Sequence, residues 1–214
     1  MDTRTSMLLA NMMSSSGGGI PAQYEVVDWI QSSYSQYIDT GIIVNDQTIT
    51  YLYCKFNMNN NSSSVQTVFG VEGGVGGGDW SDIRLFYNGN SYRTEIHIYD
   101  NNIYDLSIVR NAINEIKIEN QVLTFNGTTR SLGSYKTANV GTRTLPLFCM
   151  QGASLSYFTT TKMYSFQLGS SAKNLVCDYV PVYDTVTQKY GMFDKVSQTF
   201  KPSATSSEFT GGND

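Results

Sequence analysis

Carboxylates and one histidine are the side chains of this sequence that could support catalysis. Hydrolysis of a glycosidic bond uses two carboxyl groups, one as the acid and the other as the base or nucleophile. The glutamates are Glu25, Glu72, Glu95, Glu115, Glu119 and Glu208. Glu115 and Glu119 lie on one face of a predicted strand, but Lys117 lies between them, which is typical of a solvated outer surface. The glutamates therefore do not predict a catalytic pair.

His97 lies in the alternating stretch EIHIY, which predicts that His97, Glu95 and Tyr99 share one face of a strand. A catalytic serine on a nucleophile elbow would need the pattern G-x-S-x-G, and the sequence contains none. The stretch GGVGGG at residues 73–78 lacks the G-K-[ST] ending of a phosphate-binding loop. We therefore predict no catalytic residue and expect that the protein is not an enzyme.

Acidic and amide side chains that suit calcium gather between residues 79 and 105, because this ion prefers oxygen ligands. The candidates, which we expect in loops, are Asp79, Asp82, Asp100, Asn101, Asn102 and Asp105. Their spacing matches no recognised calcium motif, and the three cysteines form no C-x-x-C pair. The sequence therefore predicts no metal site and no cofactor, with calcium as the alternative.

The same region mixes aromatic and polar side chains as glycan-binding sites do. A sugar stacks on an exposed aromatic ring and exchanges hydrogen bonds with Asp and Asn side chains. The candidates are Asp79, Trp80, Tyr87, Tyr92, Tyr99, Asp100 and Asn102. Trp80 follows a glycine-rich stretch, which favours an exposed ring; the alternative is that the ring folds back over the rim of the domain.

Short strands and turns must position these residues, since the sequence is rich in Tyr, Phe, Thr and Val. Residues 48–56, TITYLYCKF, predict a strand buried on both sides, and residues 114–120, NEIKIEN, alternate between apolar and charged. Asn126 and Gly127 predict a tight turn. About a dozen such strands without an amphipathic helix predict an all-β antiparallel β-sandwich of the jelly-roll kind.

Residues 1–20 form a separate N-terminal extension before a body domain at residues 21–214. The extension has an apolar patch, followed by the flexible Ser and Gly joint at residues 14–19. The patch contains Met7, Leu8, Leu9, Met12 and Met13, which we predict as an anchor that docks onto another protein. The alternative is a leader that docks onto nothing.

The charge balance argues against two classes of partner. The net charge is −4, and only 15% of the residues are charged, without a basic stripe. Nucleic acids and anionic membranes attract basic surfaces, so we expect neither as a partner. No apolar stretch approaches the roughly 20 residues that span a bilayer.

Three stretches resemble one family. They are QYEVVDWIQSSYSQYIDTGI at residues 23–42, NEIKIENQVLTFNG at residues 114–127, and a closing block from residue 162 to residue 212. These resemble the laminin-G-like branch of the concanavalin A-like lectin/glucanase superfamily, over nearly the whole body domain. The glucanases of that superfamily carry E-x-D-x-x-E on a strand, and this sequence has no such motif.

The resemblance implies a protein of phages or bacteria of the gut. On this reading the chain is a non-enzymatic virion structural protein, a capsid decoration, head fibre or tail fibre at the virion surface. Its lectin-like domain adheres to glycans of the host surface or of mucus, and its extension binds other virion proteins. A trimer suits such proteins, although no coiled-coil heptad is present. The alternatives are a secreted or cell-surface carbohydrate-binding protein of a gut bacterium, and a glycan hydrolase.

The resemblance also assigns a structural role to YGMFDKVSQTF at residues 190–200. It implies a late hairpin with Phe193 and Phe200 in the core. EFTGG at residues 208–212 then closes an edge of the sandwich and buries Phe209. We therefore expect the chain to be ordered almost to Gly212.

Overall fold

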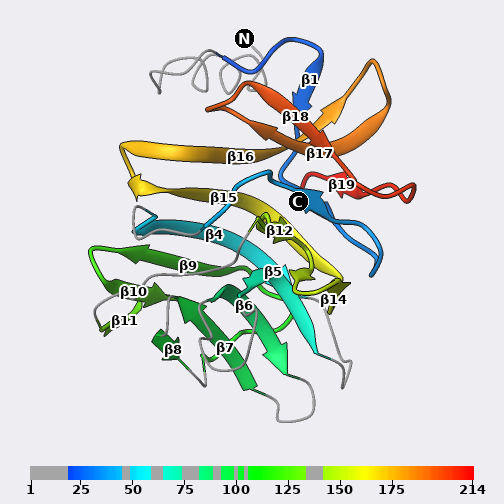
Figure 1. Ribbon diagram of the computed structural model, residues 1–214. Coiled ribbons are helices and arrows are strands. Elements are labelled where there is room, and N and C mark those ends of the chain that lie inside the picture. Colours follow the sequence, from blue (N-terminus) through cyan, green and yellow to red (C-terminus); the bar gives the residue numbers. More distant parts are fainter. Residues whose placement is uncertain are drawn as a thin grey trace.

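Two β-sheets pack face to face around one hydrophobic core (Figure 1). The computed structural model describes residues 19–44, 49–58, 65–73, 82–88, 93–98, 101–103, 106–133 and 142–214. Its strand pairs are antiparallel, apart from one parallel pair between β13 and β5. In this described part, no helix is long and apolar enough to cross a membrane. The prediction of an all-β antiparallel protein is thus confirmed.

Sheet A has eleven strands, eight of which follow the order β11-β10-β9-β4-β15-β16-β17-β18, with β1, β2 and β19 added at its side. These strands are β1 (Tyr24–Val26), β2 (Trp29–Gln31), β4 (Tyr51–Met58), β9 (Asn114–Glu119), β10 (Val122–Phe125), β11 (Thr128–Ser131), β15 (Thr161–Ser171), β16 (Asn174–Asp184), β17 (Lys189–Asp194), β18 (Thr199–Pro202) and β19 (Thr210–Gly212). The sheet therefore unites the beginning of the described chain with its end.

Sheet B has eight strands and is curled like half of a barrel. Its main order is β14-β13-β5-β6-β7-β8, and β12 joins β3 to β5. The strands are β3 (Ile38–Asp39), β5 (Gln66–Glu72), β6 (Asp82–Asn88), β7 (Arg93–Ile98), β8 (Asn101–Ile103), β12 (Pro146–Leu147), β13 (Met150–Gln151) and β14 (Leu155–Ser156). The described residues thus form nineteen strands, more than the dozen predicted, because several strands of two or three residues are invisible to periodicity.

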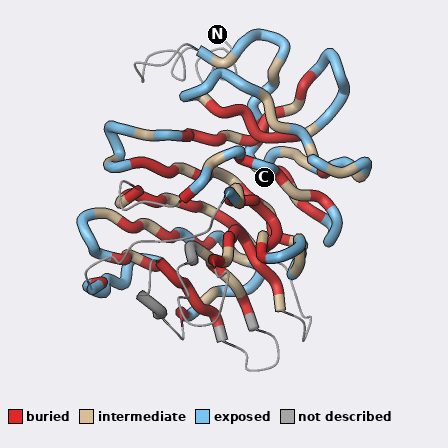
Figure 2. Tube along the Cα trace, in the orientation of Figure 1, coloured by how far each residue is buried: buried red, intermediate tan, exposed pale blue. Residues whose placement is uncertain are grey.

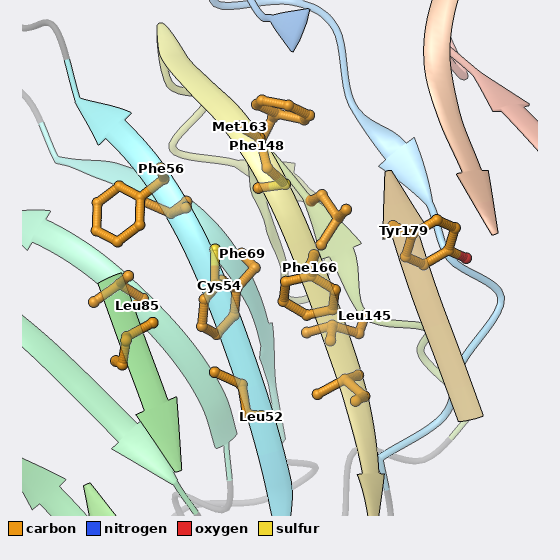
Figure 3. Packing of buried hydrophobic residues seen from close by; sticks show 14 of the residues in the cluster. Leu52, Cys54, Phe56, Phe69, Leu85, Leu145, Phe148, Met163, Phe166 and Tyr179 are labelled. Carbon is orange, nitrogen blue, oxygen red and sulfur yellow. The ribbon is translucent and has the colours of Figure 1, made fainter. Parts of the chain in front are cut away.

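Strand β4 runs through the middle of sheet A and corrects one prediction. Leu52, Cys54 and Phe56 point into the core, where they pack with residues of both sheets (Figure 3). Tyr53 and Lys55 alternate with them and are only half-buried. The strand is therefore buried on one side, because a tyrosine on the outer side keeps its ring on the sheet and its hydroxyl near water.

The β9–β10 hairpin confirms the alternation that the sequence predicts. Ile116 and Ile118 are buried in the core, whereas Lys117 and Glu119 form an ion pair of 2.7 Å on the outer face. The turn after β10 places Asn126 and Gly127 at positive φ, as the Asn-Gly pair predicts.

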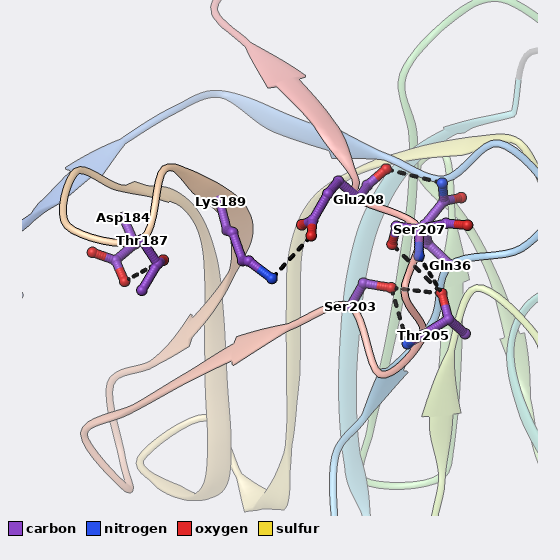
Figure 4. A network of polar contacts seen from close by, with 8 residues as sticks. All are labelled: Gln36, Asp184, Thr187, Lys189, Ser203, Thr205, Ser207 and Glu208. Atoms are coloured by element: carbon purple, nitrogen blue, oxygen red, sulfur yellow. Dashed lines mark hydrogen bonds and ion pairs between the residues drawn. The ribbon is translucent and has the colours of Figure 1, made fainter.

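The stretch QYIDTG makes the corner at which the chain passes from sheet A to sheet B. Oδ1 of Asp39 accepts hydrogen bonds from the Gly41 amide, at 3.0 Å, and from Oγ1 of Thr144, at 2.8 Å. Gly41 has a φ of 73°, which glycine adopts without strain. Gln36 donates from Nε2 to the carbonyl of Glu208 and so ties the corner to the closing block (Figure 4).

The closing block is ordered and contains the predicted β17–β18 hairpin. Phe193 is buried, as predicted, and its ring lies 5.0 Å from that of Tyr24. Phe200 is half-buried instead of fully buried, and its ring stacks on that of the same tyrosine. Phe209 is 3% exposed and packs against Phe148, which confirms that the segment before β19 closes the core. Buried residues run along the middle of the strands, and turns carry most of the exposed ones (Figure 2).

The three cysteines are buried and form no disulfide. Burial raises the pKa of the Cys149 thiol to about 12, and it also raises the pKa of Cys54 and of Cys177. These thiols are protonated at neutral pH and act as small apolar side chains.

Candidate functional site

The face of sheet B that points away from the core carries polar side chains side by side. Leu85 of β6 and Ile96 of β7 are fully buried in the core. Their sequence neighbours point the other way, because side chains alternate along a strand. These neighbours are Arg84, Phe86, Glu95 and His97. The cross-strand pairs Arg84 with His97 and Phe86 with Glu95 bring the four together.

Arg84, Glu95 and His97 form a line across three strands together with Glu72 of β5. We call these four residues the charged row. The Nη1 atom of Arg84 lies 3.6 Å from Oε1 of Glu72, and Nη2 of Arg84 lies 3.2 Å from Nδ1 of His97. Nε2 of His97 lies 3.2 Å from Oε2 of Glu95. A neutral imidazole with its proton on Nε2 satisfies both histidine contacts, as acceptor from Arg84 and as donor to Glu95.

The charged row is largely shielded from solvent, with Glu72 as its most accessible member. The side chain of Glu72 is 25% exposed, compared with 6% for His97. Shielded charges are stable only when they are paired, and here carboxylates lie at both ends with the guanidinium and imidazole between them. Arg84 also lies over the ring of Phe86, 4.8 Å from its centroid. The row is therefore held rigidly by its own contacts.

Two glycines border the charged row at points where the backbone comes close to it. Gly70 of β5 pairs with Arg84, and a Cβ atom at Gly70 would lie only 2.7 Å from the Cβ of Arg84. A Cβ atom at Gly152 would lie 3.3 Å from Oε2 of Glu72. Strand β5 thus offers no side chain next to the guanidinium, and the backbone approaches the row closely.

Chemically, the charged row alternates hydrogen-bond acceptors and donors over a short distance. Carboxylate oxygens accept only, and guanidinium groups donate only. Neighbouring sugar hydroxyls, each of which donates and accepts, match such an alternation. Phe86 adds a half-buried ring beside the row. Within the row, Glu72 offers the most accessible acceptor for such a ligand.

The sequence predicted part of this site. Glu95 and His97 share a strand face, as the alternation predicted, although His97 is buried in an ion cluster and not a surface residue. Glu72, Arg84 and Phe86 were not predicted as site residues. The alternation in IRLFYN could have predicted that Arg84 and Phe86 share one face of their strand. The contact of Arg84 with Glu72 could not be predicted in this way, because it depends on how β5 pairs with β6.

Of the seven predicted glycan-binding residues, Tyr87 and the backbone of Asn102 lie in the described part. Tyr87 is 5% exposed and belongs to the core, its hydroxyl accepts a hydrogen bond from Arg110, and its ring has no open face for a sugar. Asn102 pairs with His97 in the β7–β8 ladder. The other five, Asp79, Trp80, Tyr92, Tyr99 and Asp100, lie outside the described residues.

The strands nevertheless fix where some of those segments leave sheet B. Asp79 and Trp80 lie in sequence between Glu72 and Asp82, and these two strand residues pair with each other. Ile98, after which Tyr99 and Asp100 follow, pairs with Ile83. The ends of β5 and β7 and the start of β6 therefore lie together, at the Glu72 end of the charged row.

The predicted calcium ligands are not all in loops. Asp82 lies in β6, and Asn101 and Asn102 lie in β8, because these polar residues take part in ladders of sheet B. Asp79, Asp100 and Asp105 lie outside the described residues, and within that described part no three His, Cys, Asp or Glu side chains are placed to hold a metal ion. The predicted anchor residues Met7, Leu8, Leu9, Met12 and Met13 also lie outside it.

A small hollow lies between the β10–β11 hairpin and the segment before β9. It has a volume of about 100 Å³ and is lined by Leu106, Leu123, Phe125 and Arg130, among others. Pockets for small ligands are typically about 300–1,000 Å³. This hollow is therefore too small for a sugar chain.

A scan against models of known protein families gives no match, and a search among curated proteins gives none either.

Proposed function

We propose that this protein is a non-enzymatic glycan-binding protein of the phage virion surface. In this proposal its body is a concanavalin A-like jelly roll of the laminin-G-like kind, and the charged row on sheet B is the binding face. The single observation that carries the binding function is this row, in which Glu72, Arg84, His97 and Glu95 alternate acceptors and donors across three strands, with Glu72 as its most accessible member.

The charged row favours binding over hydrolysis. A glycosidase needs one carboxyl group that gives a proton and another that attacks or activates water. Here Glu72 is paired with Arg84, and Glu95 is hydrogen bonded to His97, so each carboxylate is already engaged by a neighbouring side chain. Such groups are better suited to orient hydroxyls than to exchange protons with them.

The virion location rests on the resemblance of the sequence stretches. The stretches at residues 23–42 and 162–212 also have clear structural roles, as the corner between the sheets and as the closing block. In the proposal, residues 1–20 bind other virion proteins, and the body faces outward, as a monomer or a trimer. The alternative, a carbohydrate-binding protein of a gut bacterium, shares the binding face and differs in location.

A glycan array tests the binding function. The full chain, applied to mucin and capsular glycans, is expected to bind a subset of them. Glu72→Gln keeps the shape of the most accessible row member and removes its charge, and we expect at least tenfold weaker binding. Arg130→Ala, which removes an exposed charge from β11, is the matched control and should bind like the wild type. An array without signal, or equal binding by Glu72→Gln, would contradict the proposal.

Mass spectrometry of purified phage particles tests the location. The account expects peptides of this chain in intact particles, and expects a chain that lacks residues 1–20 to be absent from them while still folding. Detection only in bacterial culture supernatant or cell envelopes would favour the alternative.

A further inference from the structure

Three hydrogen-bond donors converge on one carboxylate at the outer face of sheet A. Nε1 of Trp29 lies 3.0 Å from Oδ1 of Asp214, and Nζ of Lys162 lies 3.4 Å from the same oxygen. The hydroxyl of Tyr164 donates to Oδ2 of Asp214 at 3.1 Å. Trp29 belongs to β2 and the other two donors belong to β15, so neighbouring strands position the donors. We call Trp29, Lys162 and Tyr164 the donor triad.

The indole of Trp29 is covered by groups of its own chain. Nζ of Lys162 lies 3.7 Å from the centroid of the ring. Gly212 pairs with Trp29 in the β19–β2 ladder, and a Cβ atom at Gly212 would lie 3.3 Å from Cζ2 of the indole. The backbone of Gly212 therefore packs against the ring, in the way that the flat face of a sugar packs against tryptophan.

Asp214, whose carboxylate occupies the donor triad, is attached to the core only through other residues of its segment. Phe209 and the β19–β2 ladder anchor the segment, whereas the side chain of Asp214 is 52% exposed and its amide donates to Oδ2 of Asp28 at 2.9 Å. Desolvation raises the pKa of the Asp214 carboxyl, but the contacts from Tyr164, Lys162 and Trp29 outweigh it and hold the pKa below 3.8. The triad thus stabilises an anionic carboxylate that can leave without disturbing the core.

We propose that the donor triad is a second binding site, specific for carboxylated sugars of the uronic acid class, and that Asp214 occupies it as a built-in competitor. A uronic acid brings one carboxylate for the three donors and a pyranose ring for the indole, so it replaces the contacts of both Asp214 and Gly212. The site lies on sheet A and goes beyond the function proposed for the charged row of sheet B.

The competition between Asp214 and an external uronic acid determines how much the affinity should rise when Asp214 is removed. A tethered group acts at an effective concentration of about millimolar or more, so an external sugar competes poorly while Asp214 is in place. Replacing Asp214 with alanine removes the competing carboxylate, and with it a contact to Trp29 that helps to hold the Gly212 backbone over the indole, and it keeps the three donors and Phe209. We therefore expect the affinity for an external uronic acid to rise at least tenfold.

The test uses the full chain and two matched probes, methyl β-D-glucuronide and methyl β-D-glucoside, which differ only in the carboxylate. In NMR titrations that follow the indole Nε1–H signal of Trp29, Asp214→Ala should bind the glucuronide at least tenfold more tightly than the wild type does, and should bind the glucoside weakly. Adding Lys162→Met to Asp214→Ala should remove the gain, whereas adding Lys173→Met, which changes an exposed lysine of the β15–β16 turn, should not.

Three outcomes would overturn the inference. They are equal glucuronide affinity in the wild type and Asp214→Ala, equal affinity for the glucuronide and the glucoside, and equal affinity for the glucuronide and acetate. The last would mean that the triad holds any small anion. None of these results changes the array behaviour of Glu72→Gln, so a failure here is distinct from a failure of the charged row.

Discussion

The two polar surfaces of this protein satisfy their charges in different ways. In the charged row of sheet B, residues of neighbouring strands pair with one another and form a line from Glu72 to Glu95. In the donor triad of sheet A, Trp29 donates a hydrogen bond to Asp214, which lies 185 residues away in the sequence. The row is therefore formed by the sheet itself, whereas the triad depends on where a distant segment lies.

This difference teaches which surface is rigid and which can exchange its contacts. Breaking a shielded charge pair leaves an uncompensated charge away from water, which is costly. Breaking an exposed pair lets both groups return to water at little cost. The row should thus behave as part of the fold, and the triad as an exchangeable contact. The following predictions test this contrast, from the largest effect to the smallest.

Phe209→Ala should have the largest effect, because the closing segment is anchored by this ring and not by Asp214. The substitution removes a buried aromatic side chain that packs on Phe148, and we expect a loss of about 4 kcal/mol in the free energy of unfolding. Urea unfolding followed by tyrosine and tryptophan fluorescence measures it. If Phe209→Ala lowers the free energy of unfolding less than Asp214→Ala does, then Phe209 is not the main anchor of the closing segment.

Arg84→Ala should destabilise the fold by about 3 kcal/mol, since it leaves Glu72 without its ion-pair partner and removes a contact of His97. The matched control is Lys162→Met, which breaks the exposed pair with Asp214 and should cost below about 1 kcal/mol. Denaturant unfolding of both variants gives the comparison directly. Equal losses would mean that the row is no more integral to the fold than the triad.

Gly70→Ala should cost about 2 kcal/mol, because the new Cβ meets the Cβ of Arg84 at 2.7 Å and the strands must shift. Gly19→Ala is the control, since a Cβ there meets nothing within 4 Å. Thermal unfolding of the two variants checks the prediction. If the two melt alike, the close approach of β5 to the charged row does not constrain the sheet.

Asp214→Asn should have the smallest effect and should depend on pH. The folded state lowers the pKa of this carboxyl below its ordinary 3.8, so the ionised form stabilises the fold. The contribution is present above pH 3.8 and is lost as the pH falls through the lower folded-state pKa. The difference in melting temperature between wild type and Asp214→Asn should therefore be seen at pH 7 and shrink as the pH falls below 3.8. A difference that grows on acidification would contradict the assignment.

Local patterns in the sequence predicted the elements whose contacts are local. The alternation of Ile116 and Ile118, and the Asn126-Gly127 turn, are set within one hairpin, so periodicity suffices. The β4 strand was predicted as buried on both sides because Tyr53 counts as apolar in a pattern, although it lies on the outer face.

The rest of the candidate sites could not be predicted from the sequence, because they depend on how separate strands pair. Glu72 meets Arg84 only because β5 and β6 pair in one register, with a shift between Thr67 and Phe69. No spacing rule gives such a register in advance. The donor triad is less visible still, since it needs β2, β15 and the segment after β19 together.

The sequence also contains a repeated turn that was not predicted. Its two copies read DTVTQ and DKVSQ. In each copy the aspartate, Asp184 or Asp194, accepts from the amide two residues later and from the hydroxyl three residues later, and the glutamine has positive φ. Figure 4 shows the first copy, where Thr187 donates to Asp184. The two turns end β16 and β17 and so keep the closing block in register.

The central claim is that glycans bind at the charged row of sheet B. His97 is the only histidine of the chain, so its imidazole NMR signals report on the row without overlap from another residue. The most direct test titrates the full chain with a glycan selected on the array and follows the His97 imidazole and the Trp29 indole together. The account predicts saturable shifts of the His97 signals. Saturating binding that leaves His97 unchanged would contradict it.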